Sequence, residues 1–256
     1  MIRLILVGTG NVSKAIARAV QKTNKINLVH VIGRNNQLST AYPVKVPYAT
    51  DLSKLPDCDL ILLTVQDQMI KSVSDKLVPH HAVVAHTSGA SNIDLLSAHK
   101  HRGVLYPIQT FSDKSRLEWK NIPICWEANT LKTQNILKEF AQSLGVNKFV
   151  ELDHQKRTVL HLGAVLVNNF SNRLYESAQQ LLGQNQLDFE LLKPLILETA
   201  YKITKQSPAE SQTGPARRGD RLIIKKHMSI ISNKALLEVY KTFTNQILNA
   251  YEHEKL

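Results

Sequence analysis

A short glycine-rich segment near the N-terminus has the residue types and spacing to hold a phosphate group. Gly8, Gly10 and Ser13 lie in the run Gly-Thr-Gly-Asn-Val-Ser, which is a G-x-G-x-x-G pattern with serine in the third position. The first glycine permits a tight turn, the second lets the backbone approach a pyrophosphate, and the third position needs only a small side chain. A glycine turn that binds no ligand is the alternative. The expected contact residues are Gly8, Thr9, Gly10, Asn11 and Val12.

The segments on either side of this loop are the ones that a phosphate-binding loop requires. Residues 2–7 are apolar apart from Arg3, which is typical of a buried parallel strand. Residues 12–22 carry apolar side chains at helical spacing. A phosphate would then lie at the N-terminus of this helix, where backbone N–H groups have no partner within the helix.

The end of the second expected strand, residues 28–32, carries a basic residue in place of an acidic one. A protein that prefers NAD places Asp or Glu there, against the ribose 2′-hydroxyl. Here the chain reads Gly33-Arg34-Asn35-Asn36, and Arg34 can bind a 2′-phosphate while Asn35 or Asn36 adds a donor. The pattern favours NADP as the cofactor. An Arg34 that is merely solvated in a turn is the alternative.

Further strand ends are expected to face the same ligand, because the carboxyl ends of parallel strands meet at one edge of a sheet. Residues 60–65 and 82–86 are two such strands. Asp67 is interpreted as a helix cap. For each residue of 86–89, a place in an ordinary turn is as good an interpretation as a contact with a ligand. The expected cofactor contacts are Val65, Gln66, Thr87 and Ser88, and the expected pocket floor is Tyr106, Gln109 and Thr110.

Strand-like and helical segments alternate up to residue 152, and only helical patterns follow. The alternation predicts a doubly wound parallel sheet, with further strands over 103–106, 122–126 and 148–152. We therefore predict an α/β Rossmann domain with a parallel sheet over residues 1–152, followed by an all-α domain over residues 153–256. The expected helices of the second domain cover 153–182, 188–206, 220–231 and 233–254, with a loop over 207–219.

The first helix of the second domain carries side chains suited to acid–base chemistry. His161 precedes Asn168 and Asn169 by about two turns, and a regular α-helix of about 3.6 residues per turn places His161 and Asn168 on one face. A histidine can donate a proton to a carbonyl oxygen that receives a hydride, with a pKa suited to neutral pH. The three residues are the candidate catalytic group. A histidine satisfied within a helical core is the alternative.

Composition argues against other classes of protein. The 256-residue chain has a formal charge of +11, but its Lys and Arg are scattered and not interleaved with aromatics, so we expect no nucleic-acid partner. Cys58 and Cys125 fit no metal or redox spacing, which predicts no metal site and a cytoplasmic, reducing location. No apolar run approaches the roughly 20 residues of a membrane span, and no signal peptide is visible.

Motifs spread from Gly8 to Asp220 resemble those of a bacterial family of NADP oxidoreductases. This family combines a Rossmann-like N-terminal domain with a family-specific helical C-terminal domain. It is distantly similar to pyrroline-5-carboxylate reductase and the β-hydroxyacid dehydrogenases. The resemblance implies NADP as cofactor and a homodimer formed through the helical domain, which its apolar helices also predict. The motifs are GTGNVS, GRNN, TVQD, HTSGA, YPIQTF, HLGAVLVNNF and QTGPARRGD.

The resemblance also implies a reaction. In the β-hydroxyacid dehydrogenases the corresponding helix carries Lys-x-x-Asn-Asn with Lys as the general acid/base, whereas this chain has Val165 at the Lys position and His161 one turn earlier. We expect NADPH-dependent reduction of a carbonyl or imine in a small metabolite, such as a ketopantoate-like acid. A non-catalytic NADP-binding redox sensor is the alternative. Residues 212–220 are expected either to pack near an active site, from the partner subunit, or to connect helices, with Asp220 as a cap.

Overall fold

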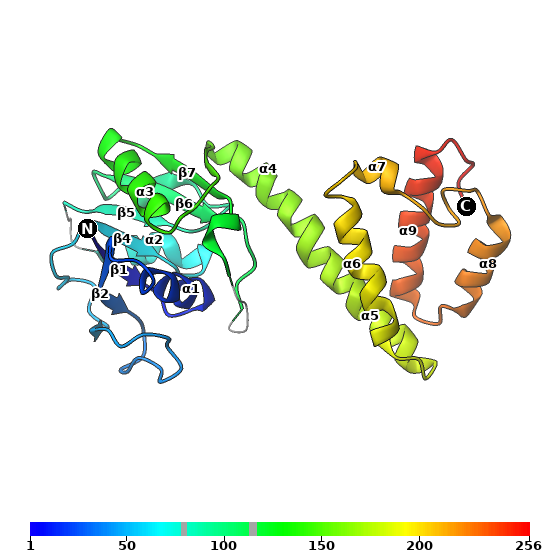
Figure 1. The fold of residues 1–256 in the computed structure, drawn as a ribbon, viewed down its shortest axis with the longest axis horizontal. Helices are drawn as coiled ribbons and strands as arrows, with labels where there is room; N and C mark the ends of the chain where they lie inside the picture. The colour runs from blue at the N-terminus through cyan, green and yellow to red at the C-terminus, as the bar shows by residue number, and fades with distance from the viewer. Residues whose placement is uncertain (78–80, 113–116) are drawn as a thin grey trace. The chain divides into compact units, whose positions relative to one another are not determined.

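The computed structural model describes residues 1–77, 81–112 and 117–256. The chain forms two compact units, Met1–Asn168 and Asn169–Leu256 (Figure 1). None of the helices in the described residues has the length and apolar character needed to cross a membrane.

The N-terminal unit is built on one sheet. Within the described residues its strand order is β3-β2-β1-β4-β5-β6-β7-β8, and the neighbouring strands are parallel except for β6 and β7. Together with the helices that cover both faces, this confirms the predicted α/β Rossmann architecture. The strands are β1 (Ile2–Val7), β2 (Ile26–Ile32), β3 (Tyr48–Ala49), β4 (Leu60–Leu63), β5 (Val83–His86), β6 (Arg102–Pro107), β7 (Ile124–Ala128) and β8 (Phe149–Glu151).

The sheet is buried on both faces, which explains the continuous apolar runs in its central strands. Successive side chains of β1 point to opposite faces, so Leu4 and Leu6 join one core cluster while Ile5 and Val7 join the other. The first cluster includes side chains of α1 (Asn11–Val20) and α3 (Leu131–Ser143), and the second includes side chains of α2 (Ile70–Ser74) and η2 (Ile93–Leu96). The remaining short helices of this unit are η1 (Asp67–Met69) and η3 (Trp119–Asn121).

Two features of the sheet differ from the prediction, one in strand direction and one in the number of strands. Strand β7 runs antiparallel to β6, with Tyr106 opposite Cys125, because the chain returns along the same edge; the described part of the connection holds only η3 and no crossover helix. Strand β3 was not predicted, since two residues directly after Pro47 carry no periodic pattern.

A long helical segment follows the sheet. Asp153 caps α4 (His154–Ala164) by accepting a hydrogen bond from the Lys156 N–H at 2.8 Å, as the predicted helix start requires. The segment continues as the π-helix η4 (Val165–Phe170) and as α5 (Ser171–Gln184). The predicted boundary after residue 152 marks the end of the sheet, whereas the compact units divide between Asn168 and Asn169 because α4 packs on the sheet.

The C-terminal unit is helical. Asp188, Asp220 and Asn233 cap its helices with their side chains, close to the predicted starts. The predicted loop over 207–219 is partly wrong, because Ser207 and Glu210 form a reciprocal capping box that stabilises one short helix within it. The helices after α5 are η5 (Phe189–Leu192), α6 (Lys193–Lys202), α7 (Pro208–Ser211), α8 (Arg221–Ile230) and α9 (Lys234–Ala250).

Candidate functional site

The turn after β1 requires glycine at its first position. Gly8 has φ +116°, a backbone conformation that residues other than glycine rarely adopt. A Cβ atom here would lie 2.6 Å from the carbonyl oxygen of Thr64. The Gly8 N–H donates to the Ile32 carbonyl at 2.8 Å, and the Thr64 hydroxyl donates to the Val7 carbonyl at 3.0 Å. The loop is therefore held tightly over the ends of β2 and β4.

Gly10 differs, because the protein itself does not require its small size. A Cβ atom at Gly10 would meet nothing within 4 Å. Gly10 is the N-cap of α1, its backbone is extended, and no side chain of the described residues caps this helix. The first turn of α1 also contains no acidic residue. The free N–H groups at this helix end are consequently open to an anion.

The other residues of the glycine loop are placed as follows. Ser13, in the third position of the pattern, is buried, and its hydroxyl lies 2.7 Å from the hydroxyl of Tyr42. Asn11 is exposed and its side chain donates to the Phe111 carbonyl at 3.0 Å. Val12 packs against the core, so it can offer a ligand only its backbone. The predicted cofactor contacts of Thr9, Asn11 and Val12 stay predictions.

The loop after β2 presents Arg34 to solvent. A Cβ atom at Gly33 would collide with the hydroxyl of Tyr48, so glycine lets this ring pack against the loop. The same hydroxyl donates to the Asn35 carbonyl at 2.7 Å. Arg34 is exposed and forms no ion pair in the part of the chain that the structure describes. A short strand that sequence reasoning missed thus holds the loop in place, and the guanidinium remains available for a phosphate.

The loops after β4 and β5 are tied to one another. Gln66, not Asp67, is the N-cap of η1, and neither side chain makes a cap hydrogen bond. The interpretation of Asp67 as a cap is therefore wrong; its carboxylate instead accepts from the Ser88 hydroxyl at 2.7 Å. Ser88 is buried, and its Oγ also accepts from the Ser91 N–H at 3.0 Å. The Ser88 hydroxyl therefore stabilises the loop through hydrogen bonds within the protein. The predicted contact between Ser88 and the cofactor stays a prediction.

The neighbouring positions are less constrained. Thr87 is half-buried, and its hydroxyl donates to the Leu63 carbonyl at 3.4 Å. Val65 is half-buried and Gln66 is exposed, both directly after the carboxyl end of β4. These positions lie at the edge of the sheet where the glycine loop lies, as predicted from the parallel strands.

His161 lies at the carboxyl end of β6. Its Nδ1 atom is 3.1 Å from the hydroxyl of Tyr106, and the two rings meet edge to face with centroids 5.8 Å apart. A Cβ atom at Gly89 would lie 2.7 Å from Cζ of Tyr106 and 2.9 Å from Nδ1 of His161. The histidine therefore packs on the strand ends of the N-terminal unit and not within a core made of helices alone, while its predicted catalytic role stays a prediction.

A buried arginine fixes the helix that carries His161. Arg157, one turn earlier on α4, has a fully buried side chain. Its guanidinium donates to the Glu127 carboxylate at 2.5 Å and to the Ser91 carbonyl at 2.7 Å. Nothing in the local sequence distinguishes this arginine from an exposed one, so the sequence did not predict its role.

Burial, and to a lesser extent the charge of Arg157, lower the pKa of the nearby His86 to about 4. His86 is completely buried, and its Nδ1 accepts from the Ser88 N–H at 3.2 Å. The neutral imidazole therefore has a structural role near Arg157 of α4, and its burial keeps it out of contact with a ligand.

The two asparagines lie in the π-helix η4, and both are exposed. The prediction that His161 and Asn168 share a face assumed a regular α-helix. A π-helix closes its hydrogen bonds one residue later than an α-helix, so this assumption does not hold over Val165–Phe170, and the shared face stays a prediction. Single-turn π segments often occur at functional sites. The proposed substrate contacts of Asn168 and Asn169 stay predictions.

Other candidate features have structural roles. Asp220 caps α8 by accepting from the Ile223 N–H at 3.2 Å, which confirms the predicted cap, while packing of the loop near an active site of the partner subunit stays a prediction. The Arg217 guanidinium lies over the ring of Tyr251 at 5.3 Å, so this arginine is held within its own unit. Among the described residues, no group of three His, Cys, Asp or Glu side chains could hold a metal ion.

The fold and the glycine loop together define a Rossmann-type protein with a helical C-terminal unit. A family model described as "Domain of unknown function (DUF2520)" matches residues 122–247. A solved structure described as a "putative NADP oxidoreductase" from Bacteroides fragilis is 30% identical, with a TM-score of 0.86 over 97% of this chain and 98% of that one. The chain belongs to the same family as this Bacteroides fragilis protein.

More distant structures share the fold. A protein from Thermotoga maritima is 24% identical, with a TM-score of 0.80 over 97% of this chain and 99% of that one. The 1-pyrroline-5-carboxylate reductase of Streptococcus pyogenes is 15% identical, with a TM-score of 0.67 over 97% of this chain and 98% of that one. No curated protein matches the chain.

Proposed function

We propose that this protein is an NADP-dependent oxidoreductase that reduces a carbonyl or imine group of a small metabolite. The observation that carries the proposal is the glycine loop, in which Gly8 is required by the fold while Gly10 faces open space at an uncapped helix end. Arg34, exposed after β2, supplies the charge that a 2′-phosphate needs. The name of the Bacteroides fragilis relative supports the same cofactor and class of reaction.

Each part of the chain has a definite task in this proposal. The N–H groups at the start of α1 bind the pyrophosphate, and Arg34 binds the 2′-phosphate. Val65, Gln66, Thr87 and Ser88 line the nicotinamide side. NADPH, when bound, supplies the hydride. His161 gives a proton to the oxygen or nitrogen atom of the group being reduced, while Asn168 and Asn169 orient the substrate.

The cofactor half of the proposal is tested by a glycine substitution. Gly10→Ala adds a methyl group where the protein leaves free space, so the free energy of unfolding should not fall. The same methyl group would stand between the backbone and the pyrophosphate, so NADPH affinity should fall at least about tenfold. Unchanged NADPH affinity in Gly10→Ala would place the ligand elsewhere.

The catalytic half is tested by following NADPH oxidation with a panel of 2-keto acids, ketopantoate included, and cyclic imines. Turnover of at least one of them supports an oxidoreductase. His161→Gln should then lower turnover about 10²–10⁴-fold while NADPH affinity stays near wild type. His227→Gln, which alters a histidine of the C-terminal unit, is the control. NADPH binding without turnover of any compound would favour a redox sensor.

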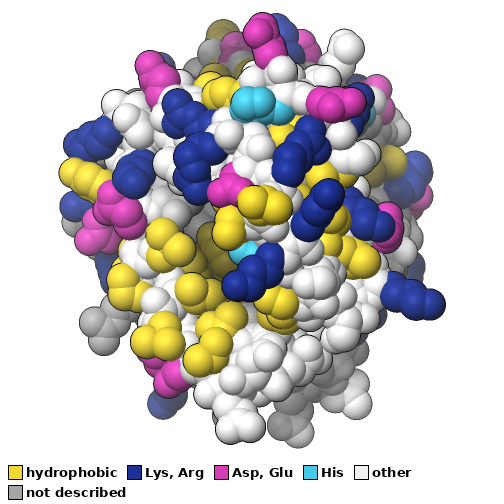
Figure 2. All heavy atoms as spheres, turned by 90° about the vertical axis from the view of Figure 1, so that its right-hand side faces the viewer, with side chains coloured by type: hydrophobic (Ala, Val, Ile, Leu, Met, Phe, Trp, Pro, Cys, Tyr) yellow, Lys and Arg dark blue, Asp and Glu magenta, His cyan; other side chains and the backbone are white. Residues whose placement is uncertain are grey.

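We also propose that the C-terminal unit forms a two-fold homodimer. Large apolar side chains of this unit remain exposed: Leu222 to 81%, Leu197 to 71% and Leu191 to 69%. Figure 2 shows one face of the molecule on which hydrophobic side chains lie at the surface between Lys and Arg. Exposed apolar surface of this kind often marks a protein–protein interface.

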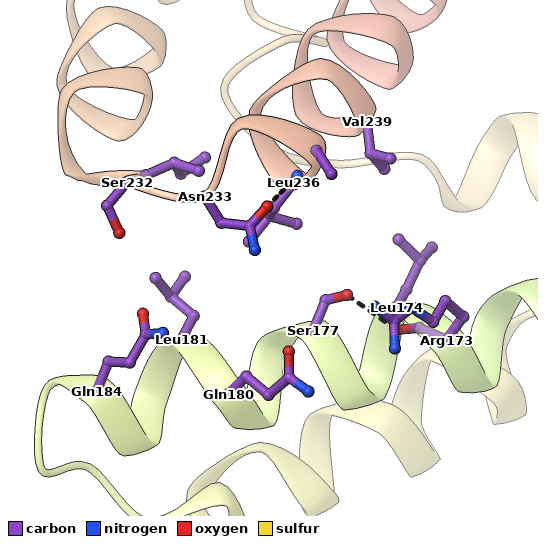
Figure 3. A pocket seen from close by; sticks show the side chains of 12 residues that line it. Arg173, Leu174, Ser177, Gln180, Leu181, Gln184, Ser232, Asn233, Leu236 and Val239 are labelled. Atoms are coloured by element: carbon purple, nitrogen blue, oxygen red, sulfur yellow. Dashed lines mark hydrogen bonds between the residues drawn. The ribbon is translucent and has the colours of Figure 1, made fainter.

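A groove in the same unit supports this assembly. It has a volume of about 160 Å³ and lies between α5 and the start of α9. Leu174 and Leu181 of α5 line it from one side and Leu236 from the other (Figure 3). An apolar side chain of a second copy would fit such a groove.

The proposal also includes a reducing, cytoplasmic location. The free thiols of Cys58 and Cys125, both buried, agree with it.

A further inference from the structure

The hydroxyl of Tyr106 has one partner among the described residues, and that partner is Nδ1 of His161. Tyr106 is 8% exposed, whereas the histidine ring is half-buried. Burial raises the pKa of Tyr106, so the hydroxyl keeps its proton at neutral pH. A protonated phenol can both donate and accept a hydrogen bond. Tyr106 can therefore stay bonded to Nδ1 whether or not that nitrogen carries a proton.

We propose that Tyr106 is a positioning residue, which holds the ring of His161 so that Nε2 is the nitrogen that reacts with the substrate. This inference rests on the proposed role of His161 as the proton donor. In the reduction, the Nε2–H bond of the imidazolium breaks and the proton moves to the substrate oxygen or nitrogen, while NADPH gives the hydride to the carbon. The neutral ring then keeps its remaining proton on Nδ1, where the Tyr106 oxygen accepts a hydrogen bond from it.

Gly89 makes this contact possible. Any side chain at position 89 would enter the space between the two rings, since a Cβ atom would approach both Cζ of Tyr106 and Nδ1 of His161 to less than 3 Å. Gly89→Ala should therefore separate the pair without removing either polar group. Gly163 is a matched control on the same helix as His161, because a Cβ atom there would meet nothing within 4 Å.

A second tyrosine–histidine pair provides a control for the loss of the hydroxyl itself. His227 Nδ1 lies 2.9 Å from the hydroxyl of Tyr240, and these rings also meet edge to face, with centroids 5.9 Å apart. This pair joins α8 to α9 in the C-terminal unit, and we assign it no part in the reaction. Tyr240→Phe removes the same kind of hydrogen bond as Tyr106→Phe.

The experiment combines NADPH-dependent turnover with ¹⁵N NMR of the histidine rings, the His161 signals being assigned from His161→Gln. Tyr106→Phe should lower kcat about tenfold with little change in substrate KM or NADPH affinity, because one hydrogen bond that orients the donor is lost. The Nδ1 signal of His161 should shift. Gly89→Ala should produce both effects, and Gly163→Ala and Tyr240→Phe should produce neither.

Unchanged kcat in Tyr106→Phe, or His161 ring signals that stay in place, would overturn the inference. The NMR measurement needs no turnover, so it still tests the contact if no substrate is reduced. Absence of turnover in the wild type would count against the proposed function, while shifted His161 signals in Tyr106→Phe and Gly89→Ala would still support the positioning of the ring.

Discussion

The two units of the molecule differ in how completely they bury their apolar residues. In the N-terminal unit, every residue of β4 is at most 1% exposed, and both faces of the sheet are covered by a core cluster. In the C-terminal unit, the core cluster contains only Ala216, Ile224 and Leu248 as buried members. The first unit thus has a complete core, whereas the second leaves many large apolar side chains exposed.

Buried polar groups are distributed in the same unequal way. His86, Ser88 and Arg157 are buried in the N-terminal unit, around the elements that place His161. The C-terminal unit buries Thr244 as its single polar residue within the described chain. Polar groups enclosed with specific partners restrict a structure to one arrangement. The buried polar groups that position candidate site residues therefore lie in the N-terminal unit. The C-terminal unit has few such groups and exposes apolar side chains instead.

The largest expected effect concerns assembly. Leu197 and Tyr201, one turn apart on α6, are 71% and 59% exposed. Replacing both by Glu should convert a dimer into a monomer, because each copy loses about 3 kcal/mol or more of apolar burial and must desolvate charges. Light scattering after size exclusion measures the result, with Glu198→Gln on the same helix as the control. A wild-type protein that is monomeric at micromolar concentration would contradict the proposed homodimer.

The second prediction concerns the buried ion pair of the N-terminal unit. Glu127→Gln leaves Arg157 without its carboxylate, which should lower the free energy of unfolding by about 3–5 kcal/mol. Urea unfolding followed by tryptophan fluorescence reports on this unit, since Trp119 and Trp126 both lie in it. Glu118→Gln, which removes an exposed pair with Lys120, should cost less than about 1 kcal/mol. Equal effects of the two substitutions would show that Arg157 is not buried as described.

The third prediction concerns pH. The folded protein holds the pKa of His86 at about 4, compared with 6.5 for an unperturbed histidine. Between these values the unfolded chain binds a proton that the folded chain does not, so stability is full above pH 6.5 and falls by about 3 kcal/mol at most towards pH 4. His86→Asn should flatten this dependence in urea unfolding. The same slope in the variant would assign it to other groups.

These regions also differ in how far the sequence predicts them. The glycine loop, the basic residue after β2 and the central strands follow from local patterns, because tight turns and buried parallel strands restrict the residue types directly. Asp153 as the start of a long helix is equally local. Each of these predictions depends on fewer than about ten consecutive residues.

Other features depend on contacts between distant segments. Arg157 is buried by Glu127 and Ser91, which lie 30 and 66 residues away in the sequence. The reversed direction of β7 and the two-residue strand β3 are likewise decided by tertiary packing. The π-helix has no recognised sequence signal here, so the prediction assumed a regular α-helix around Asn168.

The smallest expected effect concerns cofactor binding, and it tests whether the N-terminal unit carries the NADP site. Arg34→Ala removes one charge-assisted contact, which should weaken NADPH binding by about 1.5–3 kcal/mol and leave NADH binding nearly unchanged. Tyr48→Phe frees the Asn35 carbonyl and should produce a weaker change in the same direction. Lys22→Ala, at another exposed cation of this unit, is the control. An equal loss of affinity for both cofactors would mean that Arg34 does not meet the 2′-phosphate.

The most direct test of the central claim is a fluorescence titration of the wild-type protein with NADPH and with NADH. The open N-terminus of α1 should hold the pyrophosphate of either, while Arg34 distinguishes the 2′-phosphate. We predict that NADPH binds at least about tenfold more tightly than NADH. Equal affinity for the two cofactors, or no binding of either, would contradict the assignment of this unit as an NADP site.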